Sequence, residues 1–96
     1  MKSPIDPQFG KALRGVRRAR GLSQEAFDQV SSRTYISCLE RGIKQPTLAK
    51  IAQLAAVLKV SPISLVALSF AGGSHSEAKK MLARAGDELG ELASSD

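Results

Sequence analysis

The 96-residue sequence has little of what marks secreted or membrane-bound proteins. It contains a single cysteine, so no internal disulfide can form, which suits a reducing cytosol. Its longest apolar stretch, residues 63–71, is interrupted by two serines and falls short of the roughly 18 apolar residues of a membrane span. Residues 1–20 hold no continuous apolar segment. We therefore expect a cytoplasmic protein with no secretory leader and no membrane contact.

The sequence also lacks the clusters of side chains that are typical of catalytic or metal-binding sites. The single histidine, His75, the single cysteine, Cys38, and the scattered carboxylates form no nucleophile–base pair and no metal-ligand spacing. No glycine-rich phosphate loop is present. We therefore expect a protein that is not an enzyme and that uses no metal and no cofactor. Oxidation of an exposed Cys38 could block a binding face, but we interpret it as an unreactive small residue.

What the sequence does have is one domain's length, an apolar content of 43% and a formal net charge of +5. The charge is uneven, because residues 1–70 hold 11 basic and 4 acidic side chains, whereas residues 71–96 hold 3 basic and 5 acidic ones. Such a basic segment favours an anionic partner, nucleic acid first and an anionic membrane second. At this length we expect no separate ligand-sensing domain.

Apolar spacing and capping residues predict an all-α fold. Phe9, Leu13 and Val16 lie at i, i+4 and i+7 of a first helix that we expect to begin at Asp6-Pro7 and to end at Gly21. Two short helices, 24–30 and 33–41, should follow, with Ser23 and Ser32 as their caps. A fourth helix begins after Thr47 and a fifth at Ser61-Pro62. Lys59 stands where a glycine would usually end the fourth helix.

The C-terminal part is predicted to be separate from this compact five-helix domain. We divide the chain into a domain over 1–71, a hinge over 72–75, and a C-terminal amphipathic helix with a tail over 76–96. Apolar residues recur in this last helix with the 4-3-4-3 spacing of a coiled-coil seam, at Ala78, Leu82, Ala85, Leu89 and Leu92. The stripe at 76–92 predicts a dimer or partner contact, or a cover for the domain's own core. Residues 65–70 are an alternative dimer patch.

Helices 24–30 and 33–41 carry the functional prediction. The second of them begins with Arg33, Thr34 and Tyr35, none of which the core requires. A helix N-terminus presents donors and a partial positive charge to phosphate, and the outer side chains behind it can meet base edges in the major groove. The arrangement predicts a helix-turn-helix that reads double-stranded DNA.

Several motifs in order extend this prediction to residues 9–68. They are Arg17-x-x-Arg20-Gly21-Leu22-Ser23-Gln24-Glu25, Tyr35-Ile36-Ser37-x-Leu39-Glu40-Arg41-Gly42, Pro46-Thr47-Leu48 and Leu54-Ala55-x-x-Leu58-x-Val60-Ser61. With them the chain resembles the phage repressor/Cro-type helix-turn-helix proteins, the xenobiotic-response-element (XRE) family. The resemblance implies a repressor-like five-helix bundle that acts as a homodimer on a two-fold operator, in a bacterial or phage-like cytoplasm.

The resemblance also implies roles for individual residues. Arg33, Thr34 and Cys38 match the family's base-reading positions, and Arg33 would prefer guanine O6 and N7. Gln24 matches the family's phosphate clamp, and further phosphate contacts are expected from Tyr35, Ser37, Arg41 and Lys44. Glu40 matches a carboxylate that pairs with a basic group of the first helix, here Arg17 or else Arg14 or Arg20.

The sequence departs from the family pattern at three places. The stretch between Phe27 and Ile36 is shorter than usual and lacks the glycine of the turn, which bears on the angle of the recognition helix. Lys59 replaces a common glycine, and Cys38 replaces a long polar residue. The leading interpretation is a dimeric transcriptional repressor. The alternatives are an antitoxin, whose 76–92 segment would bind a protein partner, and a protein-interaction adaptor with the same fold.

Overall fold

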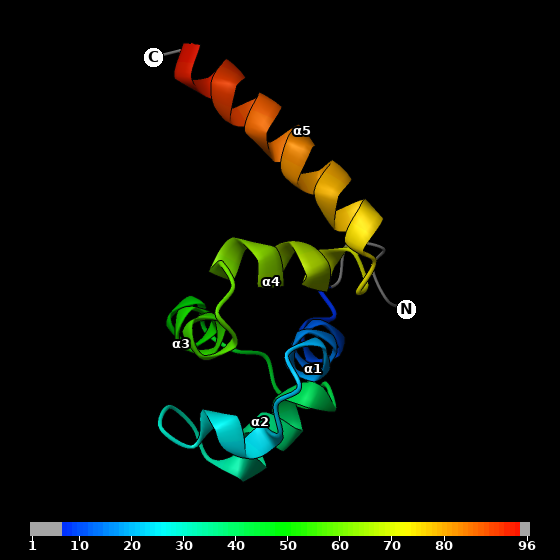
Figure 1. The fold of residues 1–96 in the computed structure, drawn as a ribbon. Helices are drawn as coiled ribbons and strands as arrows, with labels where there is room; N and C mark the ends of the chain where they lie inside the picture. Colours follow the sequence, from blue (N-terminus) through cyan, green and yellow to red (C-terminus); the bar gives the residue numbers. More distant parts are fainter. Residues whose placement is uncertain (1–6, 95–96) are drawn as a thin grey trace.

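The computed structural model describes residues 7–94, which form helices joined by short turns (Figure 1). The elements are α1 (Phe9–Ala19), the 3₁₀-helix η1 (Gln24–Phe27), α2 (Arg33–Glu40), α3 (Leu48–Leu58), α4 (Pro62–Phe70) and α5 (His75–Ser94). No strand occurs among the described residues, so the predicted all-α class is confirmed. The elements from α1 to α4 form a bundle, and α5 projects from the end of α4 (Figure 1).

Side-chain caps begin the three helices after η1, as the sequence predicted. The hydroxyls of Ser32 and Thr47 accept hydrogen bonds of 3.1 Å from the backbone amides of Tyr35 and Lys50. Ser61 accepts one of 3.1 Å from the amide of Ile63, and Pro62 is the first residue of α4. Each cap satisfies an amide that has no partner within the helix, which explains why α2, α3 and α4 begin where they do.

The predicted start of the first helix and the predicted end of the second were wrong, and the third helix ends at Glu40 rather than Arg41. The first helix begins at Phe9 rather than Pro7, with Gln8 at the capping position and no side-chain capping bond; Asp6, the expected cap, lies outside the described residues. The second helix is a single 3₁₀ turn over residues 24–27 rather than a helix over 24–30. After η1 the chain continues as a turn, in which the carbonyl of Phe27 accepts bonds from the amides of both Val30 and Ser31.

The C-terminus of α3 is closed by a residue in the left-handed conformation and by Arg20, the residue that follows α1. Lys59 has φ +59°, at the position where glycine is usual. The guanidinium of Arg20 donates to the carbonyl oxygens of Leu58 at 2.9 Å and Lys59 at 3.1 Å. Arg20 therefore satisfies orphan carbonyls of α3 and ties α1 to its end.

Lys59→Gly is expected to raise the free energy of unfolding by about 1 kcal/mol. A Cβ atom is strained at positive φ, and this gain exceeds the entropy that glycine adds to the unfolded chain. Ala56→Gly, at an exposed position within the same helix, is the matched control and should lower stability by about 1 kcal/mol. Urea unfolding followed by circular dichroism measures both. Equal losses in the two variants would contradict the strain at Lys59.

The core lies between α1, α2, α3 and α4 and includes η1. The fully buried large side chains are Phe27, Leu13, Ile36, Leu39, Leu54, Leu58 and Leu65. Gly10 allows α1 to lie directly on the C-terminal backbone of α2, because a Cβ atom there would collide with the carbonyl oxygens of Leu39 and Glu40. This close approach sets the position of α2 in the bundle.

The turn after α4 leads into a long helix that the bundle hardly covers. Gly72 and Gly73 both have positive φ, and the Ser74 hydroxyl accepts a bond of 3.2 Å from the amide of Glu77 to begin α5. Of the 20 residues of α5, Ala78 alone is buried. It packs with Ala12, Ala67 and Leu68 in a small second apolar cluster.

None of the helices within 7–94 is by itself long and apolar enough to cross a membrane; α3 and α4 taken together would pass by length and composition, but they are bent by 109°. No group of three or more His, Cys, Asp and Glu side chains in this part of the chain is placed to hold a metal ion.

Candidate nucleic-acid interface

The candidate interface centres on α2, which has one buried and one accessible face. Ile36 and Leu39 are fully buried, and they hold the helix against the core. Arg33 and Thr34, in its first turn, are exposed, whereas Cys38 is half-buried one turn further on. The first turn of α2 therefore offers a guanidinium and a hydroxyl to an incoming ligand, next to amides that have no helical partner.

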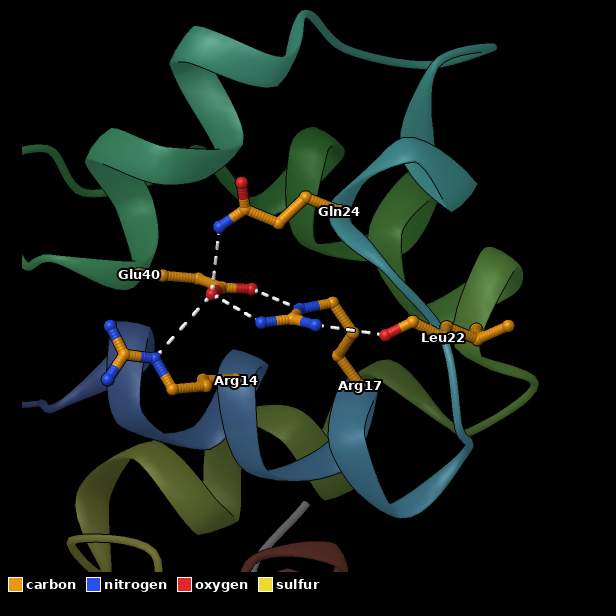
Figure 2. Close-up of polar contacts among 5 residues, drawn as sticks. All are labelled: Arg14, Arg17, Leu22, Gln24 and Glu40. Carbon is orange, nitrogen blue, oxygen red and sulfur yellow. Dashed lines mark hydrogen bonds and ion pairs between the residues drawn. The ribbon is translucent and has the colours of Figure 1, made fainter.

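A buried carboxylate at the end of α2 connects that helix to α1 and η1 (Figure 2). Arg17 donates to both oxygens of Glu40, from Nε at 2.7 Å and from Nη2 at 2.9 Å, in a bidentate ion pair. Its remaining nitrogen, Nη1, donates to the carbonyl of Leu22 at 2.9 Å. Gln24 Nε2 donates to Glu40 Oε1 at 3.1 Å, and Arg14 Nε lies 3.6 Å from the same oxygen. One carboxylate thus joins three consecutive elements.

The charge of Glu40 is stabilised by these donors. Burial by itself raises the pKa of its carboxyl, but the hydrogen bonds from Arg17 and Gln24 and the charges of Arg17 and Arg14 outweigh it and hold the pKa below the ordinary value. The hydrogen bond to Glu40 likewise raises the pKa of Arg17. With its side chain 1% exposed, Glu40 acts within the fold rather than on a ligand.

Arg33 has an ionic partner that the sequence did not indicate. Its Nη2 lies 2.7 Å from Oε1 of Glu25 in η1, and both side chains are about 60% exposed. An exposed pair of this kind contributes little to stability because water solvates both charges. Arg33 can therefore leave Glu25 for another acceptor at small cost to stability.

A basic patch lies beside α2, around Tyr35. The Nζ atoms of Lys44 and Lys50 lie 5.9 Å and 6.0 Å from the centre of the Tyr35 ring, within the range of a cation–π contact. Lys50 Nζ also donates to the carbonyl of Val30 at 2.6 Å, which ties α3 to the turn before α2. Lys50 was not among the residues predicted from the sequence to contact phosphate. Its position in the first turn of α3, one turn after a predicted cap, was the available signal.

Comparison with known proteins agrees with this geometry. A family model described as helix-turn-helix matches residues 13–65, more than half of the chain. The chain belongs to the helix-turn-helix family. It is also 41% identical over 59 residues to an uncharacterized HTH-type transcriptional regulator, y4dJ, of Sinorhizobium fredii (strain NBRC 101917 / NGR234), a match that spans 59% of this chain and 77% of that protein. The family assigned from the sequence motifs is thereby confirmed.

Within this helix-turn-helix unit, the structure groups some of the predicted contact residues and separates others. Tyr35 and Lys44 lie together, whereas the Gln24 amide contacts Glu40 and Arg33 contacts Glu25. Arg41 and Lys44 are exposed, and Tyr35, Ser37 and Gln24 are half-buried. Of the three arginines expected to pair with Glu40, Arg17 forms the bidentate pair, Arg14 approaches it, and Arg20 instead binds the end of α3.

The shortened turn of the helix-turn-helix is built without a glycine. Between η1 and α2, residues 28–32 carry the chain to the Ser32 cap, and no residue among them has positive φ. A 3₁₀ turn rises further per residue than an α-helix, so replacing the first α-helix by η1 helps a shorter segment span the same distance.

Proposed function

We propose that this protein is a sequence-specific, double-stranded-DNA-binding transcriptional regulator that acts as a homodimeric repressor. The observation that carries the proposal is the exposed first turn of α2, where Arg33 and Thr34 face outward from a helix anchored by Glu40 in a helix-turn-helix family member. The similarity to an HTH-type transcriptional regulator supports the regulatory role. A dimer bound at a promoter represses by occupying it, whereas activation needs an additional polymerase contact.

In the proposed complex, α2 enters the major groove. Arg33 exchanges the carboxylate of Glu25 for O6 and N7 of a guanine, which match its planar fork. The methyl group of Thr34 meets a thymine methyl, and Cys38 lies one turn further along the same side of the helix. Half-sites related by the two-fold axis of the dimer would be separated by one turn of DNA or a multiple of it.

Phosphate contacts are proposed to orient α2 on the backbone. They come from Gln24, Tyr35, Ser37, Arg41 and Lys44, with Lys50 added by its place beside Tyr35. Gln24 is suited to this role because a side-chain amide has two N–H donors, of which one bond to Glu40 is formed, so a phosphate oxygen can take the other. A bound phosphate would then be connected through Gln24 to the base-reading helix.

Arg33→Ala is expected to weaken binding to the preferred site by about 1–3 kcal/mol and to relax preference at one base pair. Gln24→Ala should instead weaken binding to all sequences alike, because a phosphate contact carries no base information. Arg18→Ala removes the same charge from an exposed position of α1 and serves as the control for Arg33. The measurement is selection from a random double-stranded DNA library at about 150 mM salt, repeated with each variant.

Enrichment of a two-fold symmetric site by the wild type, with altered preference at one position in Arg33→Ala only, is the expected result. Unchanged affinity and preference in Arg33→Ala would show that α2 is not the reading helix. Absence of any enriched site would overturn the proposal and favour the antitoxin or adaptor alternative, in which the apolar residues of α5 bind a different protein.

A further inference from the structure

An apolar groove lies between α4 and α5, on the side of the bundle away from α2 (Figure 1). Its walls include Ile63, Ala67 and Phe70 from α4 and Met81, Leu82 and Ala85 from α5. Ile63 is 61% exposed and Phe70 is 44% exposed, which is unusual for side chains of this size grouped in one place. The groove is therefore a surface suited to an apolar partner.

The apolar stripe of α5 continues beyond the groove. Leu89 and Leu92 follow Ala85 on the same face and are 67% and 64% exposed. Every residue from 79 to 94 is exposed, and Gly86 and Gly90 lower the helix propensity of this segment. Most of the stability of a helix in a protein comes from packing of its apolar face, which the outer half of α5 lacks. We therefore expect the outer half of α5 to pack against a second apolar surface.

The spacing of the stripe fits a second copy of α5 running in the opposite direction. Around Ala85, Leu82 lies three residues before and Leu89 four residues after, and Ala78 and Leu92 lie seven residues to either side. If two copies cross at Ala85 in antiparallel orientation, Leu89 of each copy meets Leu82 of the other. Leu92 then reaches toward the groove at the base of the other α5. Gly86 has no atom within 4 Å of its missing Cβ and permits close approach at the crossing.

Charge selects the same orientation. The half of α5 before Ala85 carries Lys79, Lys80 and Arg84 against one carboxylate, Glu77, which lies 3.5 Å from Lys80, so it is net basic. The half after Ala85 carries Asp87, Glu88 and Glu91 and no basic residue. An antiparallel pair places the basic half of each helix beside the acidic half of the other, whereas a parallel pair places like charges together. Opposite charges at the edges of an apolar seam set the orientation of paired helices.

We infer that a second copy of this chain occupies the α4–α5 groove, with the two α5 helices packed antiparallel around a two-fold axis near Ala85. The inference assigns the interface of the homodimer and in that respect rests on the proposed function. It leaves α2 uncovered, because α5 and α2 lie at opposite ends of the bundle (Figure 1). Both copies present the same patch, as a two-fold interface requires.

The first test is sedimentation of the full chain without DNA, over a range of protein concentrations. Leu89→Asp should raise the dimer dissociation constant about 30-fold or more, since it places a charge in the seam twice per dimer. Leu48→Asp makes the same change at another exposed leucine, outside the groove, and should leave the dimer intact. A monomeric wild type, or a dimer indifferent to Leu89→Asp, would overturn the inference.

Orientation is tested by disulfide formation between two differently tagged chains, one with Leu82→Cys and one with Leu89→Cys, both carrying Cys38→Ser. Antiparallel pairing should give the mixed 82–89 disulfide, because a disulfide needs Cα atoms about 4.4–6.8 Å apart. Disulfides between identical chains would show parallel pairing and overturn the inference. Neither test involves DNA. A dimer that withstands Leu89→Asp while a two-fold symmetric site is still selected refutes the inference alone, and a dimer that dissociates with Leu89→Asp but selects no DNA site refutes the proposed function alone.

Discussion

Glu40→Ala is expected to lower the free energy of unfolding by about 3 kcal/mol. The substitution removes the acceptor of Arg17 and Gln24 and leaves the Arg17 guanidinium, 12% exposed, with only the carbonyl of Leu22. Breaking a buried pair by removing one partner typically costs 3–5 kcal/mol, since the other charge stays buried. We place the loss at the lower end because Arg17 lies near the surface. Urea unfolding followed by circular dichroism measures it.

Glu25→Ala is the matched control for this prediction. It also removes a glutamate carboxylate from an ion pair with an arginine. In this pair, however, Glu25 and Arg33 are both largely exposed. Its effect on stability should stay within about 0.5 kcal/mol. Similar losses in Glu25→Ala and Glu40→Ala would contradict the structural role that we assign to Glu40.

The contribution of the Glu40 charge should depend on pH. Its pKa in the folded protein lies below the ordinary value of 4.5, so the folded state binds a proton less readily than the unfolded chain. The stabilisation is therefore fully present above that ordinary value and is lost as the pH falls through the lower folded pKa. Glu40→Gln cannot titrate. The difference in stability between wild type and Glu40→Gln should shrink between about pH 6 and pH 3, and a constant difference would contradict the assignment.

Much of the fold could be predicted because its signals are local. Ser32, Thr47 and Ser61 accept bonds from amides two or three residues ahead, so each helix start is encoded within a few residues. Gly21 and Gly42 have positive φ at the predicted helix ends, and Lys59 adopts the same conformation despite its Cβ atom. The apolar spacing placed Phe9 and Leu13 of α1 in the core for the same reason.

The remaining features depend on contacts between distant residues. The single turn of η1 and the pair between Arg33 and Glu25 depend on how the shortened turn places η1 relative to α2. The apolar periodicity of the sequence carries no information about that placement. The role of Arg20 on the end of α3 spans 38 residues of sequence. Gln24 was chosen through the family resemblance, and Arg33 first from its place at the start of helix 33–41. The structure adds that each already has a partner within the protein.

Gly10→Ala is expected to lower the free energy of unfolding by about 2–3 kcal/mol and to weaken DNA binding as well. The added methyl group would overlap the carbonyl oxygens of Leu39 and Glu40, and backbone atoms at the end of a packed helix cannot rotate away as a side chain can. Relief requires α1 and α2 to separate, which also strains the Arg17–Glu40 pair and shifts the proposed reading helix. Urea unfolding and DNA titration of the same preparation measure the two effects.

Gly15→Ala provides a control of opposite sign within the same helix. Gly15 is exposed, and no atom lies within 4 Å of the position that its Cβ would take. Alanine is favoured over glycine in a helix interior by about 1 kcal/mol, so Gly15→Ala should raise stability and leave DNA affinity unchanged. If both substitutions stabilised the protein, α1 would have to lie further from α2 than the structure places it. The opposite signs would instead show that backbone contact between these helices positions the side chains of α2.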